Sequence, residues 1–403
     1  MLHNVLQIIF YFLMVMGSMS SSYNVLDYGA ISDGYTDNSQ AFLEAWNAAC
    51  NAETRTPQVV VPEDMTFLVM PVIFEGPCIA DKIEFMILGT IVAPSSPGFW
   101  FGIDTSQWLV FRGIRGLKVD GFGSIDGQGK GWWDQSCKLH PELEGCTKLA
   151  PTALKFLGCN DSGVSNIFFR NSPQAHILTR RCNGFRVDKL MIQSPGYAPN
   201  TDGIHIQSSH HLSIINSKIS TGDDCISIGD YTSNVEIDNI DCGPGHGISI
   251  GSLGRSGNFV QVENIYVTNS RFNGTTNGAR IKTWQVGRGY LRTVVFQNLK
   301  FINVKNPIII DQNYCDVRGA CKELETGVKI SRIIYNAMSG TSSTNIAINL
   351  NCSRSVPCSG ISMQDIQLAS ATIGKQVIAS CTNADGQEFS VVPGPCLQPK
   401  IPI

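Results

Sequence analysis

The sequence predicts an all-β protein built as a parallel β-helix, and three observations lead to this fold class. Short apolar runs recur along the chain, with first apolar residues at Ile204, Ile226, Ile248, Ala279 and Ile308, which are separated by 22, 22, 31 and 29 residues. Each run is only three to five residues long, and the repeating units of about 20 to 30 residues that contain these runs are too short for a βαβ crossover. Hydrophobic residues make up 43% of the 403 residues, charged residues only 16%, and there are 39 glycines. This composition favours strands and turns over long surface helices.

The first residues predict a signal peptide over 1–22. The stretch "MLHNVLQIIFYFLMVMGSMSSS" places an apolar run from Val5 to Met16 before small residues, with Ser18 and Ser20 spaced as at a cleavage site. The run is too short to span a bilayer, and no other run is long and apolar enough to do so. A buried N-terminal helix is the alternative, but it leaves the serine run unexplained. We therefore expect a secreted, extracellular protein, in which residues 23–403 form a single domain.

The next segment predicts a helix that covers the open end of the solenoid. In "YTDNSQAFLEAWNAAC", Asp37 or Asn38 can act as an N-cap, and four apolar residues follow at helical spacing, namely Phe42, Ala45, Trp46 and Ala49. An uncovered coil would expose unpaired backbone and core, so a solenoid needs such a cap.

The recurring runs predict how successive coils stack. Apolar residues alternate with others in "GIHIQ", "CISIG", "GISIG", "ARIKT" and "PIIID". A parallel β-helix pairs each coil with the next and buries the alternate residues in a shared interior. We expect Ile204 and Ile206 to stack on Ile226 and Ile228, then on Ile248 and Ile250, then on Ala279 and Ile281. The residues between them are expected to face outward: His205, Ser227, Ser249 and Arg280.

The cysteines indicate an oxidising compartment. All fourteen lie downstream of residue 22, and an even count in a secreted chain predicts up to seven disulfides. Three pairs are close in sequence, namely Cys137 and Cys146, Cys315 and Cys321, and Cys352 and Cys358. Zinc is the alternative, but no Cys-x-x-Cys occurs, so we expect no metal. Sequons for N-glycosylation stand at Asn160, Asn273 and Asn351.

The charge distribution excludes a broad nucleic-acid interface. The formal net charge is −3, and no block of basic residues occurs anywhere in the chain. Recognition by charge must therefore be local.

Polar residues follow the same interval as the isoleucines. Counting back two positions from Ile204, Ile226 and Ile248 gives Asp202, Asp224 and His246, and adjacent strands lie about 4.8 Å apart. Strict alternation would point these three side chains inward. They face outward only if the chain turns at Gly203, Cys225 and Gly247, and glycine tolerates such a bend.

The resulting column of charge predicts acid–base chemistry. Asp223 lies beside Asp224, and Arg280 and Lys282 lie on the next coil. Like-charge repulsion raises the pKa of at least one carboxyl in such a cluster, while nearby cations lower others. A carboxylic acid beside a carboxylate is the arrangement that glycoside hydrolysis requires, and the separation between them decides between retention and inversion. Singly, each residue could be only a turn former or a solvated side chain. A shared register favours a functional site.

At these residues the sequence resembles the polygalacturonases, the pectin-degrading members of glycoside hydrolase family 28, and most closely those of plants. The resemblance covers essentially the whole chain after residue 22. It includes "SPGYAPNTDGIHI", "NPIIIDQNYC" and the N-terminal "NVLDYGAISDGYTDNSQAF". Its four signatures are Asn200-Thr201-Asp202, Gly222-Asp223-Asp224, Gly245-His246-Gly247 and Arg280-Ile281-Lys282.

The resemblance implies a single-stranded, right-handed parallel β-helix, a pectin-lyase-like solenoid, that hydrolyses α-1,4-linked galacturonic acid with inversion. By this analogy Asp223 is the general acid, and Asp202 and Asp224 activate the attacking water. His246 supports the protonation state of the acid.

The same analogy assigns five substrate-binding residues: Arg280, Lys282, Tyr314, Asn200 and Gln312. The expected partner is pectic polysaccharide in the cell wall. We expect no cofactor, and we expect a monomer. Cations beside the carboxylates agree with an acidic sugar, because three aspartates alone would repel it.

Three alternatives stay open at this point. A polysaccharide lyase would use the clustered aspartates to hold Ca²⁺. A hydrolase of rhamnogalacturonan or xylogalacturonan would share the fold, and a catalytically inactive pectin-binding β-helix would keep it without activity. The motifs do not distinguish internal cutting from cutting at a chain end.

Overall fold

The computed structural model describes residues 21–315, 321 and 324–399. The predicted signal peptide, residues 1–22, lies almost entirely outside the described residues and stays a prediction. Ser22 already belongs to strand β1 (Ser22–Asn24), and the Ser21 carbonyl accepts a hydrogen bond of 2.9 Å from the Gln58 amide. No helix in the described part of the chain is long and apolar enough to cross a membrane.

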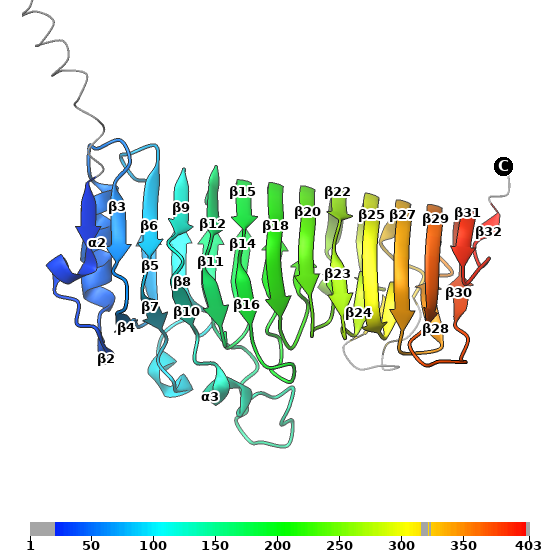
Figure 1. Ribbon diagram of the computed structural model, residues 1–403, viewed down its shortest axis with the longest axis horizontal. Coiled ribbons are helices and arrows are strands. Elements are labelled where there is room, and N and C mark those ends of the chain that lie inside the picture. The colour runs from blue at the N-terminus through cyan, green and yellow to red at the C-terminus, as the bar shows by residue number, and fades with distance from the viewer. Residues whose placement is uncertain (1–20, 316–320, 322–323, 400–403) are drawn as a thin grey trace, which may run out of the picture.

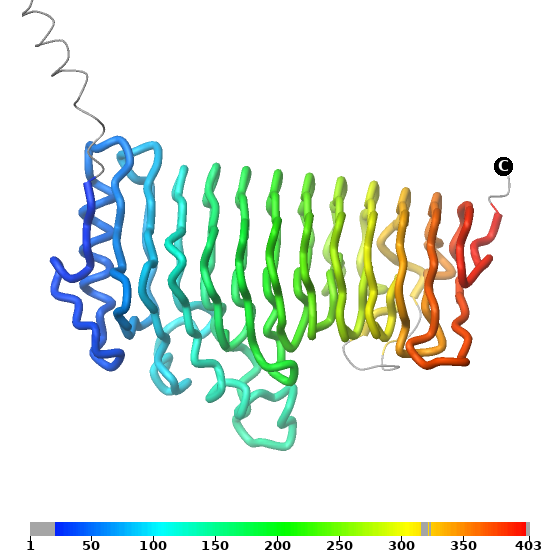
Figure 2. The backbone as a smooth tube through the Cα atoms, in the orientation of Figure 1, coloured from blue at the N-terminus to red at the C-terminus, as the bar shows by residue number. Residues whose placement is uncertain are grey.

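The described chain winds through one row of stacked coils, which Figures 1 and 2 show running from the N-terminal to the C-terminal end. Every strand pairing recorded between named strands is parallel, and each joins a strand to its equivalent on a neighbouring coil. This confirms the predicted right-handed parallel β-helix.

Two parallel sheets form the walls of the described solenoid. The short sheet, which carries the candidate site, contains β5 (Val72–Glu75), β8 (Gln107–Arg112), β11 (Thr152–Leu157), β14 (Ile177–Arg180), β17 (Ile204–Gln207), β19 (Ile226–Ile228), β21 (Ile248–Leu253), β24 (Asn277–Trp284), β26 (Asn306–Tyr314), β28 (Ile346–Asn351) and β30 (Ile378–Thr382).

The long sheet forms the opposing wall. It contains β1, β2 (Asp33–Asp37), β3 (Gln58–Val61), β4 (Thr66–Leu68), β6 (Ile83–Ile87), β7 (Thr90–Val92), β9 (Leu117–Asp120), β10 (Ser124–Asp126), β12 (Ser162–Ser165), β13 (Phe168–Arg170), β15 (Asn183–Asp188), β16 (Met191–Gln193), β18 (His210–Ser220), β20 (Ser233–Cys242), β22 (Phe259–Thr268), β23 (Arg271–Asn273), β25 (Arg288–Val304), β27 (Lys329–Ser342), β29 (Cys358–Ser370), β31 (Ala384–Val392) and β32 (Gln398–Pro399).

The described helices are few and short. They are the α-helices α2 (Ser39–Cys50) and α3 (Lys130–Trp133) and the 3₁₀ turns η1 (Val25–Tyr28), η2 (Pro97–Trp100) and η3 (Arg255–Gly257).

Helix α2 covers the N-terminal end of the solenoid, as predicted (Figure 1). Phe42 and Trp46 are fully buried, and the Trp46 indole donates a hydrogen bond of 2.9 Å to the Glu75 carbonyl. Asn38 takes the N-cap position without capping through its side chain, which instead accepts from the Ile31 amide. The Asp37 carboxylate accepts a hydrogen bond of 2.9 Å from the Ser39 amide at the start of the helix.

The isoleucine ladder has the predicted register. Ile204 pairs with Ile226, Ile226 with Ile248, and Ile248 with Ala279, and all four side chains are fully buried. Ile206, Ile228, Ile250 and Ile281 form the second row in the same order. The coils therefore share one continuous core.

Six disulfides are present among the described residues, not seven, and they include the three pairs expected from sequence. Cys159 and Cys182 keep buried free thiols. Each thiol instead contacts a backbone carbonyl of a neighbouring coil, Phe111 for Cys159 at 3.3 Å and Phe156 for Cys182 at 3.4 Å. Burial raises the pKa of the Cys159 thiol to about 12 and that of the Cys182 thiol to about 11, so both stay in the unreactive protonated form.

The ladder predicts a large loss of stability when one of its members is truncated. Replacing Ile226 with alanine leaves a cavity between two in-register neighbours, so we expect the free energy of unfolding to fall by about 2–5 kcal/mol. Urea unfolding followed by tryptophan fluorescence measures this change. Ile334→Ala is the control, because Ile334 lies on the long sheet with 41% of its side chain exposed. Equal losses in the two variants would contradict the assigned core.

Candidate active site

The candidate site lies where three strands of the short sheet begin. Asp202, Asp224 and His246 each stand two residues before the first residue of β17, β19 and β21. The backbone bends at Gly203 and Cys225, and Gly247 adopts a positive φ of 91°. A Cβ atom at Gly247 would lie 2.1 Å from the Asn277 carbonyl oxygen, so the turn requires glycine.

Backbone hydrogen bonds fix these turns to one another. The Gly203 amide donates to the Asp224 carbonyl at 2.9 Å, and the His246 amide donates to the Asp223 carbonyl at 2.8 Å. The turns solve the problem that strict alternation raised, because they take the polar side chains out of the core. Asp202, Asp223, Asp224 and His246 are thereby brought together.

Asp223 is held by two cationic or protonatable side chains. Its Oδ1 atom lies 2.9 Å from Nδ1 of His246 and also accepts a 2.9 Å hydrogen bond from the Asp224 amide. Its Oδ2 atom lies 2.9 Å from the Lys138 ammonium. Burial raises the pKa of Asp223, but the hydrogen bond and charge of His246 and the charge of Lys138 outweigh burial and lower it overall.

Asp224 is more deeply buried and has different partners. Its Oδ2 atom accepts a 2.8 Å hydrogen bond from the Lys282 ammonium, and its Oδ1 atom accepts 2.7 Å from the Ser249 hydroxyl. A guanidinium nitrogen of Arg280 lies 3.7 Å from the same Oδ1. Burial lowers the pKa of Lys282, but the Asp224 carboxylate outweighs it and raises that pKa overall. The two form a buried ion pair.

Asp202 has the opposite electrostatic environment from Asp223. Its Oδ2 atom accepts a 2.6 Å hydrogen bond from the Ser227 hydroxyl, and this hydroxyl lies 2.7 Å from Nδ1 of His205. Burial, followed by repulsion from Asp223 and Asp224, raises the pKa of Asp202 well above its usual value. Burial and the charge of Lys282 lower the pKa of His205 to about 4, so this imidazole is neutral near pH 7. The three carboxyls are therefore inequivalent.

A cationic and aromatic cluster stands next to the carboxylates. The Arg280 guanidinium lies 5.8 Å from the centre of the Tyr314 ring, and the Lys282 ammonium lies 5.6 Å from it. Trp284 packs edge-on against Tyr314 with ring centres 5.3 Å apart. These residues come from the neighbouring strands β24 and β26, so the sheet register fixes their arrangement.

Two other predicted substrate-binding residues, Asn200 and Gln312, lie outside this cluster. Asn200 is exposed, with a positive φ of 57°, in the turn that leads to Asp202. Gln312 is buried, which contradicts its predicted contact with substrate. Its amide donates to the Val328 and Val356 carbonyls at 2.8 and 3.0 Å and accepts from the Ser353 amide at 3.0 Å. The structure assigns Gln312 to the anchoring of backbone segments.

The sequence did not predict the roles of several residues at the site. The predicted register already placed three of them, Ser227, Ser249 and His205, on the outer face of the short sheet. Their contacts with Asp202 and Asp224 could have been predicted from that register. Lys138 gave no signal, because it is 85 positions from Asp223 and lies outside the repeating coils. His176 is buried and supports Asp202 from behind, with Nδ1 donating 3.0 Å to the Asp202 carbonyl. Burial lowers its pKa to about 4.

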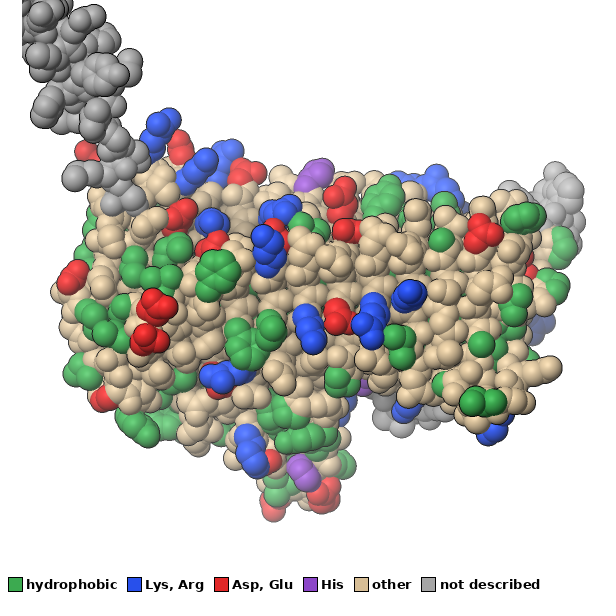
Figure 3. Space-filling model, viewed as in Figure 1, with side chains coloured by type: hydrophobic (Ala, Val, Ile, Leu, Met, Phe, Trp, Pro, Cys, Tyr) green, Lys and Arg blue, Asp and Glu red, His purple; other side chains and the backbone are tan. Residues whose placement is uncertain are grey.

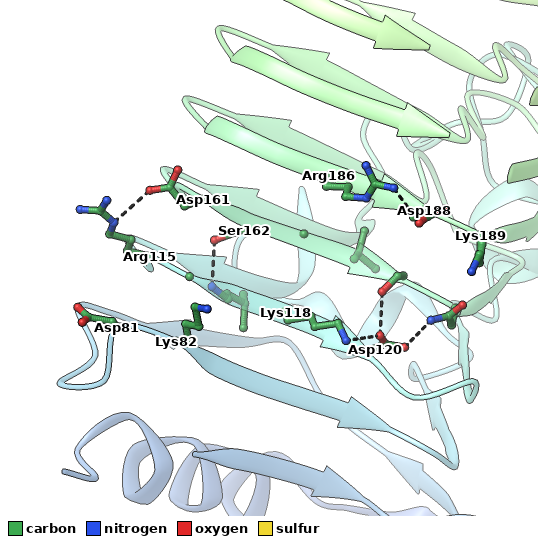
Figure 4. Close-up of a pocket in the computed structure, with 16 residues that line it drawn as sticks. Asp81, Lys82, Arg115, Lys118, Asp120, Asp161, Ser162, Arg186, Asp188 and Lys189 are labelled. Carbon is green, nitrogen blue, oxygen red and sulfur yellow. Dashed lines mark hydrogen bonds and ion pairs between the residues drawn. The ribbon is translucent and has the colours of Figure 1, made fainter. Parts of the chain in front are cut away.

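A groove with a charged lining lies on the outer face of the long sheet, away from these residues. Figure 4 shows its charged lining, which comes from β9, β12, β15 and adjoining turns. Most of its charges are paired within the groove: Arg115 with Asp161, Lys118 with Asp120, and Arg186 with Asp188. Figure 3 likewise shows acidic and basic side chains next to one another on this face. One carboxyl of the groove, Asp120, is buried, but it pairs with Lys118 and none of the other carboxyls that line the groove is buried.

The site has oxygen and nitrogen ligands that could approach a metal ion. One atom each of Asp223, Asp224 and His246 lie within 4.8 Å of one another. Both carboxylates, however, already accept from lysine ammonium groups, Lys138 and Lys282. A cation bound there would meet two positive charges, so the donor set suits proton transfer better than metal binding.

Inequivalent carboxyls at the surface of a parallel β-helix, with cations beside them, are an arrangement that suits a glycoside hydrolase. The model of "Glycosyl hydrolases family 28" matches residues 50–391. The chain therefore belongs to glycoside hydrolase family 28.

Relatives and solved structures agree with this assignment. A probable polygalacturonase of Arabidopsis thaliana is 43% identical over 393 residues, which cover 96% of this chain and 83% of that protein. A polygalacturonase of Persea americana is 41% identical over 366 residues, covering 91% and 78%. Among solved structures, an exopolygalacturonase of Thermotoga maritima has a TM-score of 0.76 at 19% identity, covering 92% and 91%. An endo-xylogalacturonan hydrolase of Aspergillus tubingensis has a TM-score of 0.79 at 24% identity, covering 93% and 100%. These structural likenesses support the fold.

The buried ion pair predicts that Lys282 stabilises the fold as well as the site. Lys282→Met removes one partner and leaves the buried Asp224 carboxylate without its ammonium, so we expect a loss of about 3–5 kcal/mol in the free energy of unfolding. Urea unfolding at neutral pH measures it. Lys300→Met, at an exposed position of β25, is the matched control and should change stability little. A loss of under about 1 kcal/mol in Lys282→Met, the value of a surface pair, would contradict a buried pair.

Proposed function

We propose that this protein is a polygalacturonase that hydrolyses α-1,4-linked galacturonic acid in pectin with inversion of configuration. The observation that carries the proposal is the cluster of Arg280, Lys282 and Tyr314 directly beside inequivalent carboxyls. Planar guanidinium groups bind carboxylates well, so the cluster suits a sugar that carries a carboxylate. The polygalacturonases that are 41–43% identical to this chain point to the same substrate.

Asp223 is the proposed general acid. Its Oδ2 atom delivers a proton to the glycosidic oxygen as the bond between that oxygen and the anomeric carbon breaks. The inner oxygen, Oδ1, remains held by His246 and the Asp224 amide. His246 thus orients the acid and adjusts its protonation state.

Asp202 and Asp224 are the proposed bases. They orient a water molecule on the opposite side of the sugar ring, and one of them accepts its proton as the water oxygen bonds to the anomeric carbon. Attack opposite to the leaving oxygen inverts the configuration. Lys282 holds the Asp224 carboxylate in place with a 2.8 Å hydrogen bond, while Ser227 partly offsets the rise in the pKa of Asp202.

Arg280, Lys282 and Tyr314 are the proposed binding residues for the substrate carboxylate. The Arg280 nitrogen nearest to Asp224 is 3.7 Å away, longer than a hydrogen bond, which leaves part of the guanidinium for substrate. Asn200, exposed next to Asp202, is proposed to contact a neighbouring sugar unit.

The protein is further proposed to act outside the cell as a monomer, directed there by the segment 1–22. Six disulfides agree with an oxidising compartment. The sequon residues Asn160 and Asn273 are exposed and thus accessible to glycosylation.

A calcium-dependent lyase is disfavoured by the two lysines that pair with Asp223 and Asp224. Elimination would also give unsaturated products that absorb in the ultraviolet, whereas hydrolysis does not.

The direct test is the release of reducing ends from polygalacturonate. Proton NMR at early times should show the β-anomer as the first product from the α-linkage, and the product sizes distinguish cutting inside the chain from cutting at its end. Asp223→Asn should lower kcat by about 10²–10⁴-fold, because an amide cannot supply the proton. It should still bind oligogalacturonate.

Asp365→Asn is the matched control for this substitution. Asp365 is exposed on β29 with a positive φ of 52°, a conformation that asparagine tolerates, so its activity should be unchanged. Loss of activity in both variants, or most activity retained in Asp223→Asn, would overturn the assignment of the acid. Unsaturated products would overturn hydrolysis itself.

The Ser227 hydroxyl predicts a shift in the acidic limb of the pH profile. Its hydrogen bond lowers the pKa of Asp202, so Ser227→Ala should raise that pKa further. Asp202 accepts a proton only when ionised, and the acidic limb of kcat/KM should therefore move to higher pH, by about one unit. Initial rates across pH measure the shift. Ser213→Ala, on the long sheet, is the control, and an unmoved acidic limb in Ser227→Ala would remove Asp202 from the role of base.

A further inference from the structure

We propose that Lys138 is a substrate-responsive positioning residue. It pairs with Asp223 in the free protein and transfers to a galacturonate carboxylate when substrate binds. Its departure frees Oδ2 of Asp223 to take up a proton from solvent. This inference rests on the proposed function and adds a reason why the acid becomes protonated only with substrate present.

The first observation is the difference between the two oxygens of Asp223. Oδ1 has two partners, both from the rigid coils: the His246 ring and the Asp224 amide. Oδ2 has one partner among the described residues, the Lys138 ammonium at 2.9 Å. The oxygen that must give its proton to the substrate is thus the one that Lys138 occupies.

The second observation is where Lys138 comes from. It belongs to the segment 127–151 between β10 and β11, which projects beyond the coils together with α3 (Figure 1). The Cys137–Cys146 disulfide and a 3.0 Å hydrogen bond from the Cys137 amide to the Thr147 carbonyl brace this segment internally. The Trp133 indole joins the segment to the coils through a 3.3 Å hydrogen bond to the Ser172 carbonyl. The Lys138 side chain is 51% exposed, whereas that of Asp223 is 10% exposed. A long, half-exposed side chain on a fixed base can change partner without moving a coil.

The third observation is the set of charged groups that face Asp223. His246 and Lys138 lower its pKa, whereas burial and the neighbouring carboxyls Asp202 and Asp224 favour a proton on it. Lys282 and Arg280 are directed to Asp224 and not to Asp223. Removing Lys138 therefore shifts the balance at Asp223 toward the protonated acid, and no other described lysine or arginine replaces it.

The substrate carries what is needed to draw Lys138 away. Each galacturonate unit has a carboxylate, and a charge-assisted hydrogen bond to an ammonium forms with it as readily as with Asp223. A methyl-esterified unit has no charge to offer. The arrangement therefore couples protonation of the acid to the presence of a free carboxylate, so it also selects for de-esterified pectin.

Lys138→Met tests this coupling through the pH profile. The alkaline limb of kcat/KM reports the acid of the free enzyme, and that of kcat reports the acid with substrate bound. In the native protein we expect the kcat/KM limb at lower pH than the kcat limb. In Lys138→Met the kcat/KM limb should rise by about one pH unit while the kcat limb stays in place. KM for polygalacturonate should rise by about tenfold, the size expected for a lost charge-assisted hydrogen bond.

Two further variants sharpen the comparison. Lys138→Arg keeps the charge and should retain separated limbs. Lys130→Met removes a lysine from the same segment that pairs with the exposed Asp134, and it should leave both limbs and KM unchanged. If both alkaline limbs move equally in Lys138→Met, Lys138 stays paired with Asp223 when substrate binds. If KM rises and neither limb moves, Lys138 only contacts the substrate. Either result, or no effect, overturns the proposal.

Proton uptake on binding provides a measurement that does not depend on turnover. Calorimetric titration of digalacturonate in buffers of different ionisation enthalpy should show proton uptake by the native protein and a smaller uptake by Lys138→Met. Binding without uptake in the native protein contradicts the exchange of partners. If the native protein neither binds digalacturonate nor cleaves polygalacturonate, the proposed function has failed, and the proposal about Lys138 fails with it.

Discussion

The in-register parallel pairing of strands is the constraint on which the rest of the structure depends. Hydrogen bonds between equivalent residues of successive coils place Ile204, Ile226 and Ile248 in one buried row. Because the register is shared, the residues two positions earlier are brought together as well. The column of polar side chains is therefore a consequence of core packing: the same pairing that buries the isoleucines brings Asp202, Asp224 and His246 together, and the turn at Gly247 aims the column outward.

Stacking alone would produce three competing carboxyls, and the surrounding partners make them different. Asp224 has a lysine in the sheet, Asp223 has a histidine and a loop lysine, and Asp202 has only neutral partners among its described hydrogen bonds. Since no cation contacts Asp202 directly, burial and repulsion raise its pKa while that of Asp223 is lowered. These partners, and not the aspartates themselves, make the carboxyls inequivalent. In the free protein they favour a proton on Asp202 over one on Asp223, so the proposed acid role of Asp223 requires a change of partner when substrate binds.

The rows of residues inside the repeat could be predicted from sequence, whereas the place of a loop residue outside it could not. The ladder and the clustering of Asp202, Asp223, Asp224 and His246 could be predicted, because a repeat interval fixes which residues share a row. The capping helix could be predicted from the helical spacing of its apolar residues. Gln312 was misassigned because a motif does not reveal on which side of the strand a side chain lies, and this one points inward to bind backbone. The seventh disulfide was not found because Cys159 and Cys182, although on neighbouring coils, direct their thiols to carbonyls. Lys138 lies outside the repeat, where no interval applies.

The origin of Lys138 also explains why a coil residue could not take its place. A side chain fixed by sheet register, such as that of Lys282, is buried and is held in a fixed ion pair with the Asp224 carboxylate. The acid needs the opposite property, because it must be protonated before bond cleavage and recover its proton after each turnover. Only a group that can leave and return changes the charge around Asp223 within a catalytic cycle. A segment outside the solenoid, braced by its own disulfide, presents a half-exposed lysine side chain next to a rigid column, so the coils position the carboxyls and this lysine controls when one of them becomes an acid.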